Sequence, residues 1–218
     1  MMALPMFKLL SLLLFIPAWE TYQSETISKL PQIAGWCSPE KARLLMDFIH
    51  EHKPEICVEI GAFGGSTTFP LARALQYEHK GVLYAIDAWD NSAAAESFAP
   101  GEPDHDWWSK VDMKAIRSGF VSLIKKEQLS RCKAIPQRFE EAAAQFADGS
   151  IDLLYVDGSA ASLREVELYF PKVKQGGYIW LNDAHYDSKN KAVAFLMRNC
   201  EWLKKKSLKN QCVLFKKK

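Results

Sequence analysis

The chain has 218 residues, of which 48% are hydrophobic, and it carries a formal net charge of only +2. This length and composition are typical of one globular domain with a substantial core, and the weak charge argues against a general nucleic-acid binder. The five cysteines are scattered without C-x-x-C spacing, which favours buried thiols over a disulfide framework or a zinc site.

The amino terminus carries Lys8 followed by an apolar run, residues 9–16. This pattern is typical of a secretory signal, but the residues after it are too large for signal-peptidase cleavage, and the run is short for a membrane span. We therefore divide the chain into a hydrophobic segment and linker, residues 1–35, and a folded domain, residues 36–218. We expect residues 1–19 to anchor at a membrane or to pack on a partner, with export as the alternative.

A helix is expected to begin the folded domain. Ser38 is a typical cap, Pro39 suits the first helical position, and Pro54 ends the apolar periodicity that follows. This helix should cover one face of a sheet.

The next element is an apolar run that ends in a glycine-rich turn. The run contains Glu59 and continues into a turn bounded by Gly61 and Gly65, after which a helix is expected to open at Ser66 or Thr67. Glycines let a chain leave a buried strand sharply and let a ligand approach the backbone. We expect Gly61, Gly65 and Ser66 to contact a nucleotide-like ligand, the alternative being a turn that only packs helix against strand.

The spacing within this turn restricts the ligand. A dinucleotide fingerprint requires glycine at the third position from Gly61, where this chain has Phe63, which argues against NAD and FAD. Glu59 would repel a pyrophosphate and attract an ammonium or a sulfonium. The ligand should therefore carry positive charge.

Three further apolar runs also end in polar residues. They end at Asp87, at Asp157 and at the pair Asn182 and Asp183. Because ligands of open parallel sheets bind outside the carboxyl ends of the strands, these residues and Glu59 should face one crevice. Asp87 is then placed to accept ribose hydroxyls, although an aspartate at such a position can also serve as a helix cap.

A long insert, residues 88–130, separates the second and third expected strands. It contains a proline-rich acidic loop that ends in Trp107 and Trp108. Above the carboxyl edge of the sheet this loop would form a lid. The tryptophans would either pack the loop against the rest of the domain or contact the substrate.

The segment from Glu59 to Ser66 resembles the first motif of class I S-adenosylmethionine-dependent methyltransferases, Glu/Asp-x-Gly-x-x-x-Gly. The resemblance covers most of the folded domain and implies S-adenosylmethionine as cofactor. It also implies an α/β fold, a Rossmann-like three-layer sandwich. Its mostly parallel seven-stranded sheet would have the order 3-2-1-4-5-7-6 and an antiparallel C-terminal strand. Gln137, just after the expected strand 132–135, would border the adenine pocket.

The resemblance also suggests a reaction, methylation of a hydroxyl on a small molecule or sugar. In the metal-dependent O-methyltransferases, residues at the ends of these strands hold a cation, so Asp157, Asn182 and Asp183 could offer three oxygens to Mg²⁺. Asp157 would contact the cofactor and would also orient or deprotonate the acceptor. Many relatives carry a His or Lys base soon after the Asp-Gly pair that is absent here, and His185 could replace it.

Two alternatives remain open. One is a metal-independent methyltransferase that acts on nitrogen, a carboxylate or a protein side chain, and the other is a cofactor-binding pseudoenzyme tethered by its amino terminus. Because S-adenosylmethionine is made in the cytosol, we expect a cytoplasmic, membrane-associated location. The sequence fixes neither the acceptor nor the oligomeric state.

Overall fold

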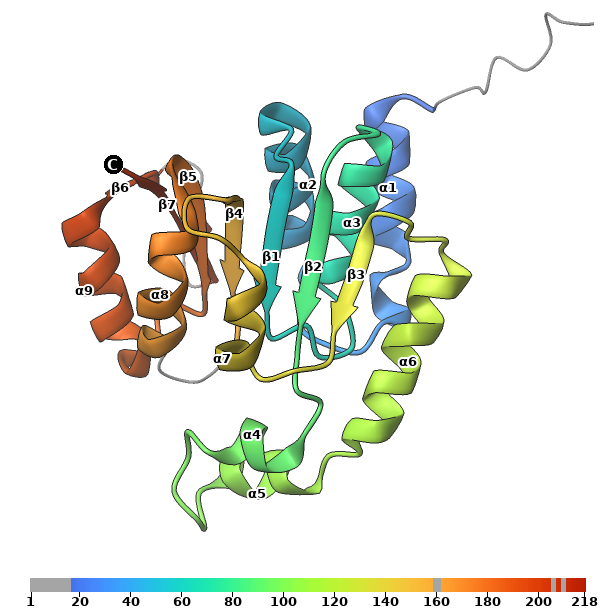
Figure 1. Cartoon of the computed structure of the whole chain (residues 1–218). Coiled ribbons are helices and arrows are strands. Elements are labelled where there is room, and N and C mark those ends of the chain that lie inside the picture. The colour runs from blue at the N-terminus through green and yellow to red at the C-terminus, as the bar shows by residue number, and fades with distance from the viewer. Residues whose placement is uncertain (1–16, 159–161, 205–206, 209–210) are drawn as a thin grey trace, which may run out of the picture.

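The structure is a computed structural model that describes residues 17–158, 162–204, 207–208 and 211–218. Within these residues a seven-stranded sheet has the order β3-β2-β1-β4-β5-β7-β6 (Figure 1). The β7 strand runs antiparallel to β5 and to β6, whereas the other neighbouring pairs are parallel. The predicted fold class is confirmed. The strands are β1 (Ile56–Ile60), β2 (Val82–Ile86), β3 (Cys132–Ile135), β4 (Ile151–Val156), β5 (Val173–Asn182), β6 (Cys200–Trp202) and β7 (Cys212–Lys217).

Helices cover both faces of this sheet, as Figure 1 shows. On one face lie α1 (Trp19–Ser28), α2 (Pro39–His52), α3 (Thr68–Tyr77) and α6 (Met113–Lys126), and on the other α7 (Phe139–Ala142), α8 (Leu163–Tyr169) and α9 (Asn190–Asn199). The insert adds α4 (Asn91–Ala95) and α5 (Pro103–Lys110). Short 3₁₀ turns span Leu30–Gln32, Ala143–Gln145, Phe170–Lys172 and Asp187–Lys189.

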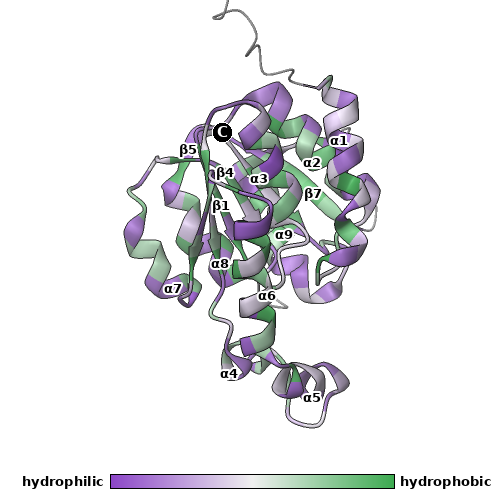
Figure 2. Ribbon diagram, turned by 90° about the vertical axis from the view of Figure 1, so that its right-hand side faces the viewer, coloured by the Kyte–Doolittle hydropathy of each residue, from purple (hydrophilic) through white to green (hydrophobic). Residues whose placement is uncertain are grey.

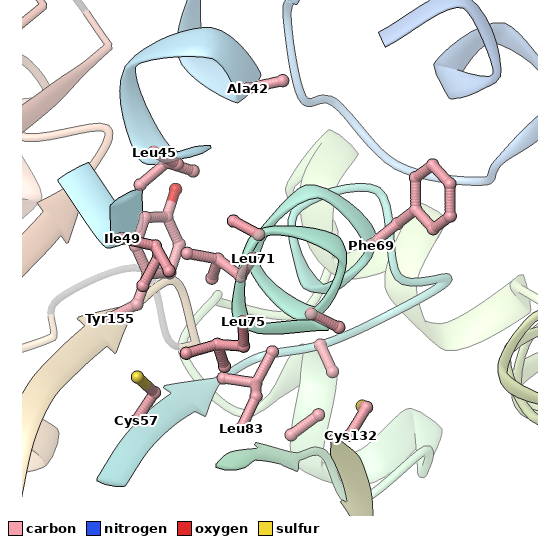
Figure 3. Close-up of a cluster of buried hydrophobic side chains, with 14 of the residues drawn as sticks. Ala42, Leu45, Ile49, Cys57, Phe69, Leu71, Leu75, Leu83, Cys132 and Tyr155 are labelled. Carbon is pink, nitrogen blue, oxygen red and sulfur yellow. The ribbon is translucent and has the colours of Figure 1, made fainter. Parts of the chain in front are cut away.

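Two apolar clusters fill the spaces between the layers. Cys57 and Val58 are neighbours on β1, yet they belong to different clusters because successive side chains of a strand point to opposite faces. Figure 3 shows one cluster, in which Leu45 of α2 and Leu71 of α3 meet side chains of the sheet. Figure 2 shows the apolar strands enclosed by helices with more polar outer faces.

The α2 helix begins where the sequence predicts. The Ser38 hydroxyl accepts a hydrogen bond from the Lys41 backbone N–H at 3.1 Å, and Pro39 occupies the first turn. Lys53, with a φ of 48°, ends the helix just before Pro54. The next helix, α3, begins at Thr68, slightly later than the predicted opening at Ser66 or Thr67.

The linker region contains a helix that packs on the body. Trp19 of α1 stacks on His50 of α2 with ring centroids 4.3 Å apart, and its Nε1 donates to Asp47 Oδ1 at 3.0 Å. The Tyr22 hydroxyl donates to the Arg73 carbonyl of α3 at 3.0 Å. The apolar run at residues 9–16 lies outside the described residues. Among the helices of the described residues, none combines the length and apolar character that a membrane crossing requires.

The insert projects beyond the carboxyl ends of the strands, where α4 and α5 form its outer part (Figures 1 and 2). The α6 helix returns along the edge of the body beside β3. Trp89, buried at the start of the insert, donates from Nε1 to the Phe63 carbonyl at 2.8 Å. This bond joins the insert to the glycine turn.

Candidate functional site

The glycine turn after β1 combines an unusual backbone with very close packing. Gly61 has a φ of +88°, and a Cβ built there would lie 2.4 Å from the Asp157 carbonyl oxygen after β4. Gly65 has a φ of +93°, and its Cβ would lie 2.8 Å from the Phe120 ring of α6. Both glycines are therefore required by the packing of this turn, whatever ligand it contacts.

Asp87 holds the same turn from the end of β2. Its Oδ2 accepts from the Phe63 backbone N–H at 2.9 Å, and its Oδ1 accepts from the Trp89 N–H at 2.7 Å. Burial raises the pKa of Asp87, while these two donors act to lower it. Because each carboxylate oxygen has two lone pairs, Asp87 can still accept further hydrogen bonds from a ligand.

Glu59, on β1, is a fully buried acid with one oxygen unsatisfied. Its Oε2 accepts from Thr68 Oγ1 at 2.6 Å, whereas Oε1 has no hydrogen-bond partner among the described residues. Burial raises the pKa of Glu59 to about 8, the Thr68 hydrogen bond opposes that shift, and the negative charge of Asp157 adds to it. An unsatisfied buried carboxylate oxygen is costly, and a cationic ligand beside it would remove that cost.

The end of the expected linker and the first residue of the folded domain, residues 34–36, cover the glycine turn. A Cβ at Gly64 would lie 2.5 Å from Ala34, and one at Gly35 would lie 2.2 Å from Oγ of the buried Ser66. Trp36 stacks on Phe63 with centroids 5.2 Å apart and contacts the insert through Trp107 at 5.7 Å. Trp36 is 66% exposed, so an aromatic surface borders the turn. The sequence analysis predicted no site residue in this loop. The signal that could have indicated one is the presence of Trp36 together with the pair Trp107 and Trp108.

A second polar cluster lies at the ends of β4 and β5. Asn182 donates from Nδ2 to Asp157 Oδ1 at 2.7 Å. Its Oδ1 accepts from Lys41 Nζ at 3.1 Å and from the Tyr155 hydroxyl at 3.0 Å. Burial raises the pKa of Asp157 to about 6, Lys41 opposes that shift, and the negative charge of Asp183 adds to it. The structure therefore brings Asp157 and Asn182 into contact and places Asp183 close enough for its charge to act on Asp157.

These residues do not fit the predicted Mg²⁺ site. The Asn182 oxygen that would face the cation instead accepts from an ammonium and a phenol. An exchange of the amide oxygen and nitrogen would set Nδ2 against the Lys41 ammonium and Oδ1 against the Asp157 carboxylate, so the network fixes the orientation. Elsewhere in the described ranges, no cluster of three or more His, Cys, Asp or Glu side chains could hold a metal ion.

Two other predicted residues lie apart from these clusters. His185 is exposed, packs against Tyr186 with tilted rings whose centroids are 4.1 Å apart, and lines a hollow beside β7. Among the described residues no hydrogen bond joins it to Asp157. Gln137 follows β3 and its Oε1 accepts from Gln145 Nε2 at 2.6 Å. The roles of His185 and Gln137 stay predictions.

Two lysines at this edge were missed by sequence reasoning. Lys41 lies four and seven residues before Leu45 and Phe48, a spacing that places it on the buried face of α2. Lys189, just before α9, is buried and donates from Nζ to Ser162 Oγ. Burial lowers the pKa of Lys189, and the nearby Asp157 opposes that shift. Nothing in the sequence around Lys189 marks it as buried.

Comparisons with known proteins identify this arrangement. A family model described as a methyltransferase domain matches residues 58–184, more than half of the chain, from β1 to just beyond β5. No curated protein matches the sequence significantly.

Solved structures share the fold at low sequence identity. The SAH-bound methyltransferase PaMTH1 of Podospora anserina is 14% identical, with 90% of this chain and 88% of that one covered and a TM-score of 0.65. A methyltransferase from Geobacter sulfurreducens is 14% identical, with 89% and 88% covered and a TM-score of 0.56. An O-methyltransferase from Bacillus cereus in complex with SAH is 13% identical, with 94% of each chain covered and a TM-score of 0.55.

Proposed function

The chain belongs to the family of methyltransferase domains, with the class I fold of enzymes that use S-adenosylmethionine, and from this premise we propose that it methylates a hydroxyl oxygen of a small molecule. The observation that carries the proposal is the unsatisfied, buried Oε1 of Glu59 beside the glycine turn, with Asp157 close enough to influence it. The site for a cation at Glu59 therefore lies next to a second acid, Asp157, at the same edge of the sheet.

The cofactor lies across the turn between β1 and α3. Glu59 faces its positive charge, Asp87 accepts its ribose hydroxyls, and Gly61, Gly65 and Ser66 form the floor beneath it. Gln137, at the end of β3, borders the adenine. SAH, the product left after methyl transfer, occupies the similar folds of the proteins from Podospora anserina and Bacillus cereus, which supports this assignment.

Asp157 receives the proton of the acceptor hydroxyl. Its Oδ1 accepts from Asn182, which leaves Oδ2 for the hydroxyl. The acceptor oxygen forms a bond to the methyl carbon, the carbon–sulfur bond breaks, its electron pair stays on sulfur, and the hydroxyl proton passes to the Asp157 carboxylate. The raised pKa of Asp157, about 6, suits a base that works near neutral pH. The Bacillus cereus neighbour, an O-methyltransferase, supports oxygen as the acceptor atom.

The cellular setting follows from the cofactor. A cytoplasmic enzyme has direct access to S-adenosylmethionine. The predicted contact segment ended at Trp19, but Trp19 packs on the body, so we restrict the proposed membrane or partner contact to residues 1–16. A fusion of residues 1–35 to a reporter tests this, because clean export of the reporter would contradict it.

Calorimetry and turnover together test the proposed function. We expect the folded protein to bind S-adenosylmethionine and SAH, and to transfer radiolabelled methyl groups to members of a panel of small hydroxyl compounds. Asp157→Asn should lower kcat at least a hundredfold and change the cofactor Kd less than about threefold. Asp148→Asn, at an exposed acid, is the matched control. The absence of binding heat with either ligand, or full activity of Asp157→Asn, would refute the proposal.

A further inference from the structure

Lys41 is a cation placed among the acids of the proposed active site. Its side chain is almost completely buried, with the residue 4% exposed, and its charge acts on both Asp157 and Glu59. Yet among the described residues no carboxylate oxygen lies within ion-pair distance of Nζ. The charge is therefore not neutralised by a direct contact.

The ammonium also has donors to spare. An ammonium carries three N–H donors, and the hydrogen bond that Lys41 makes within the described residues is the one to Asn182 Oδ1, at 3.1 Å. Burying such a group without further partners is costly. The structure thus keeps two strong donors at the carboxyl edge of the sheet, where the acceptor must approach Asp157.

The position of Lys41 is fixed at both its backbone and its side chain. Its backbone N–H is held by the Ser38 cap in the first turn of α2. Its Nζ meets an Asn182 oxygen that Tyr155 also orients, at 3.0 Å. A fixed charge needs no reorganisation when negative charge develops nearby, which is the condition for effective electrostatic catalysis.

We propose that Lys41 is a catalytic residue that binds the acceptor oxygen directly and replaces a divalent metal ion in this enzyme. The proposal rests on the proposed function. As the oxygen attacks the methyl carbon, its proton passes to Asp157 and the electron pair of the breaking carbon–sulfur bond stays on sulfur. Lys41 keeps its own protons throughout and donates hydrogen bonds to the oxygen while that oxygen carries negative charge.

The hydrogen bond from Lys41 to Asn182 Oδ1 explains why an ammonium and a metal ion exclude each other here. A cation bound between Asp157 and Asn182 would need the same Oδ1 that accepts from Lys41. Two positive charges a few ångströms apart in a buried site repel strongly. The site therefore binds one or the other, and the hydrogen bonds favour the lysine.

The first test uses a chelator and a direct measurement of metal binding. Methyl transfer by the wild-type protein should be unchanged in EDTA, and electron paramagnetic resonance should detect no Mn²⁺ bound to it. Lys41→Ala combined with Asn182→Asp removes the ammonium and adds a carboxylate, so this double variant should bind one equivalent of Mn²⁺. Inactivation of the wild type by EDTA with recovery on addition of Mg²⁺ would overturn the proposal.

The second test separates catalysis from folding. Lys41→Met should lower kcat at least a hundredfold with the cofactor Kd within about threefold, whereas Lys41→Arg, which keeps the charge and the donors, should retain more activity. Lys125→Met, at an exposed position of α6, is the control. If Lys41→Met does not fold, Lys41→Gln takes its place. Undiminished kcat in the folded variant would contradict the proposal.

The two proposals fail in different ways. A wild-type protein that binds neither S-adenosylmethionine nor SAH refutes the proposed function itself. A protein that binds the cofactor and methylates an acceptor, but loses activity on chelation, refutes only the role of Lys41.

Discussion

Thr68 Oγ1 donates a hydrogen bond to Glu59 Oε2 over 2.6 Å and so links the start of α3 to β1 across the glycine turn. The bond satisfies one oxygen of a fully buried acid and leaves the other without a partner. The turn is thereby prepared for a cation at the expense of stability in the ligand-free protein.

This arrangement predicts an unusual dependence of stability on pH. The pKa of Glu59 rises from the model-compound value of 4.5 to about 8 in the folded protein because the carboxyl group is buried. Between these values the folded state holds a proton that the unfolded state has released, so stability should fall as pH rises from 4.5 towards 8. The loss from this group should be on the order of a few kcal/mol.

Glu59→Gln tests this because glutamine does not ionise. Urea denaturation from pH 5 to pH 9 should show a flatter profile for the variant than for the wild type, with the variant more stable at the alkaline end. Its cofactor affinity should fall at least tenfold, since glutamine cannot supply the negative charge that Glu59 acquires when it releases its proton on binding the cation. Glu25→Gln, at an exposed position of α1, is the control. Equal slopes for wild type and Glu59→Gln would show that Glu59 is ionised in the folded state.

Gly61→Ala should destabilise the protein strongly. The new Cβ would lie 2.4 Å from the Asp157 carbonyl oxygen, in addition to the strain of a φ of +88°. Gly101→Ala is the control that measures backbone strain alone, because Gly101 has a similar φ of +92° but open space around it. We expect about 1 kcal/mol of destabilisation at Gly101 and several times more at Gly61. If urea denaturation showed the same loss of unfolding free energy for Gly61→Ala and Gly101→Ala, then β1 and β4 could move apart without cost.

Asp87→Ala should weaken cofactor binding by about 1 to 3 kcal/mol, because the ribose loses its acceptors. It should also lower the free energy of unfolding, since the backbone N–H groups of Phe63 and Trp89 lose the oxygens that they now donate to. Asp90→Ala removes the hydrogen bond to the Ala93 N–H at the start of α4 and should affect stability alone. Calorimetry that gave equal affinities for Asp87→Ala and the wild type would exclude Asp87 from the ribose site.

Trp19→Ala should destabilise the folded domain by about 1 to 3 kcal/mol, because it removes the stack on His50 and the hydrogen bond to Asp47. Trp36→Ala, at a side chain that is 66% exposed, should cost much less. Thermal or urea denaturation measures both. No loss in Trp19→Ala would mean that α1 contributes nothing to the stability of the body.

Much of the layout could be predicted because it depends on local patterns. Alternation and apolar runs mark strands, glycines mark a turn that needs positive φ, and Ser38 with Pro39 marks a helix start. Since parallel strands share one carboxyl edge, the acids that end β1, β2, β4 and β5 had to converge there. For this reason the sequence could predict that Glu59, Asp87, Asp157 and Asp183 lie near one another.

The partners of those acids could not be predicted in the same way. Lys41 precedes Asn182 by 141 residues, and only the packing of α2 against the sheet brings its ammonium to the amide oxygen. The same contact decides that Asn182 turns its oxygen away from a metal ion. The sequence by itself therefore determined the strands that end in acids and the glycine turn, because each follows from a short-range pattern, whereas the order of the strands in the sheet was implied by the family resemblance. The tertiary structure alone decided which cation faces those acids, because a charge acts on whatever the fold places within a few ångströms.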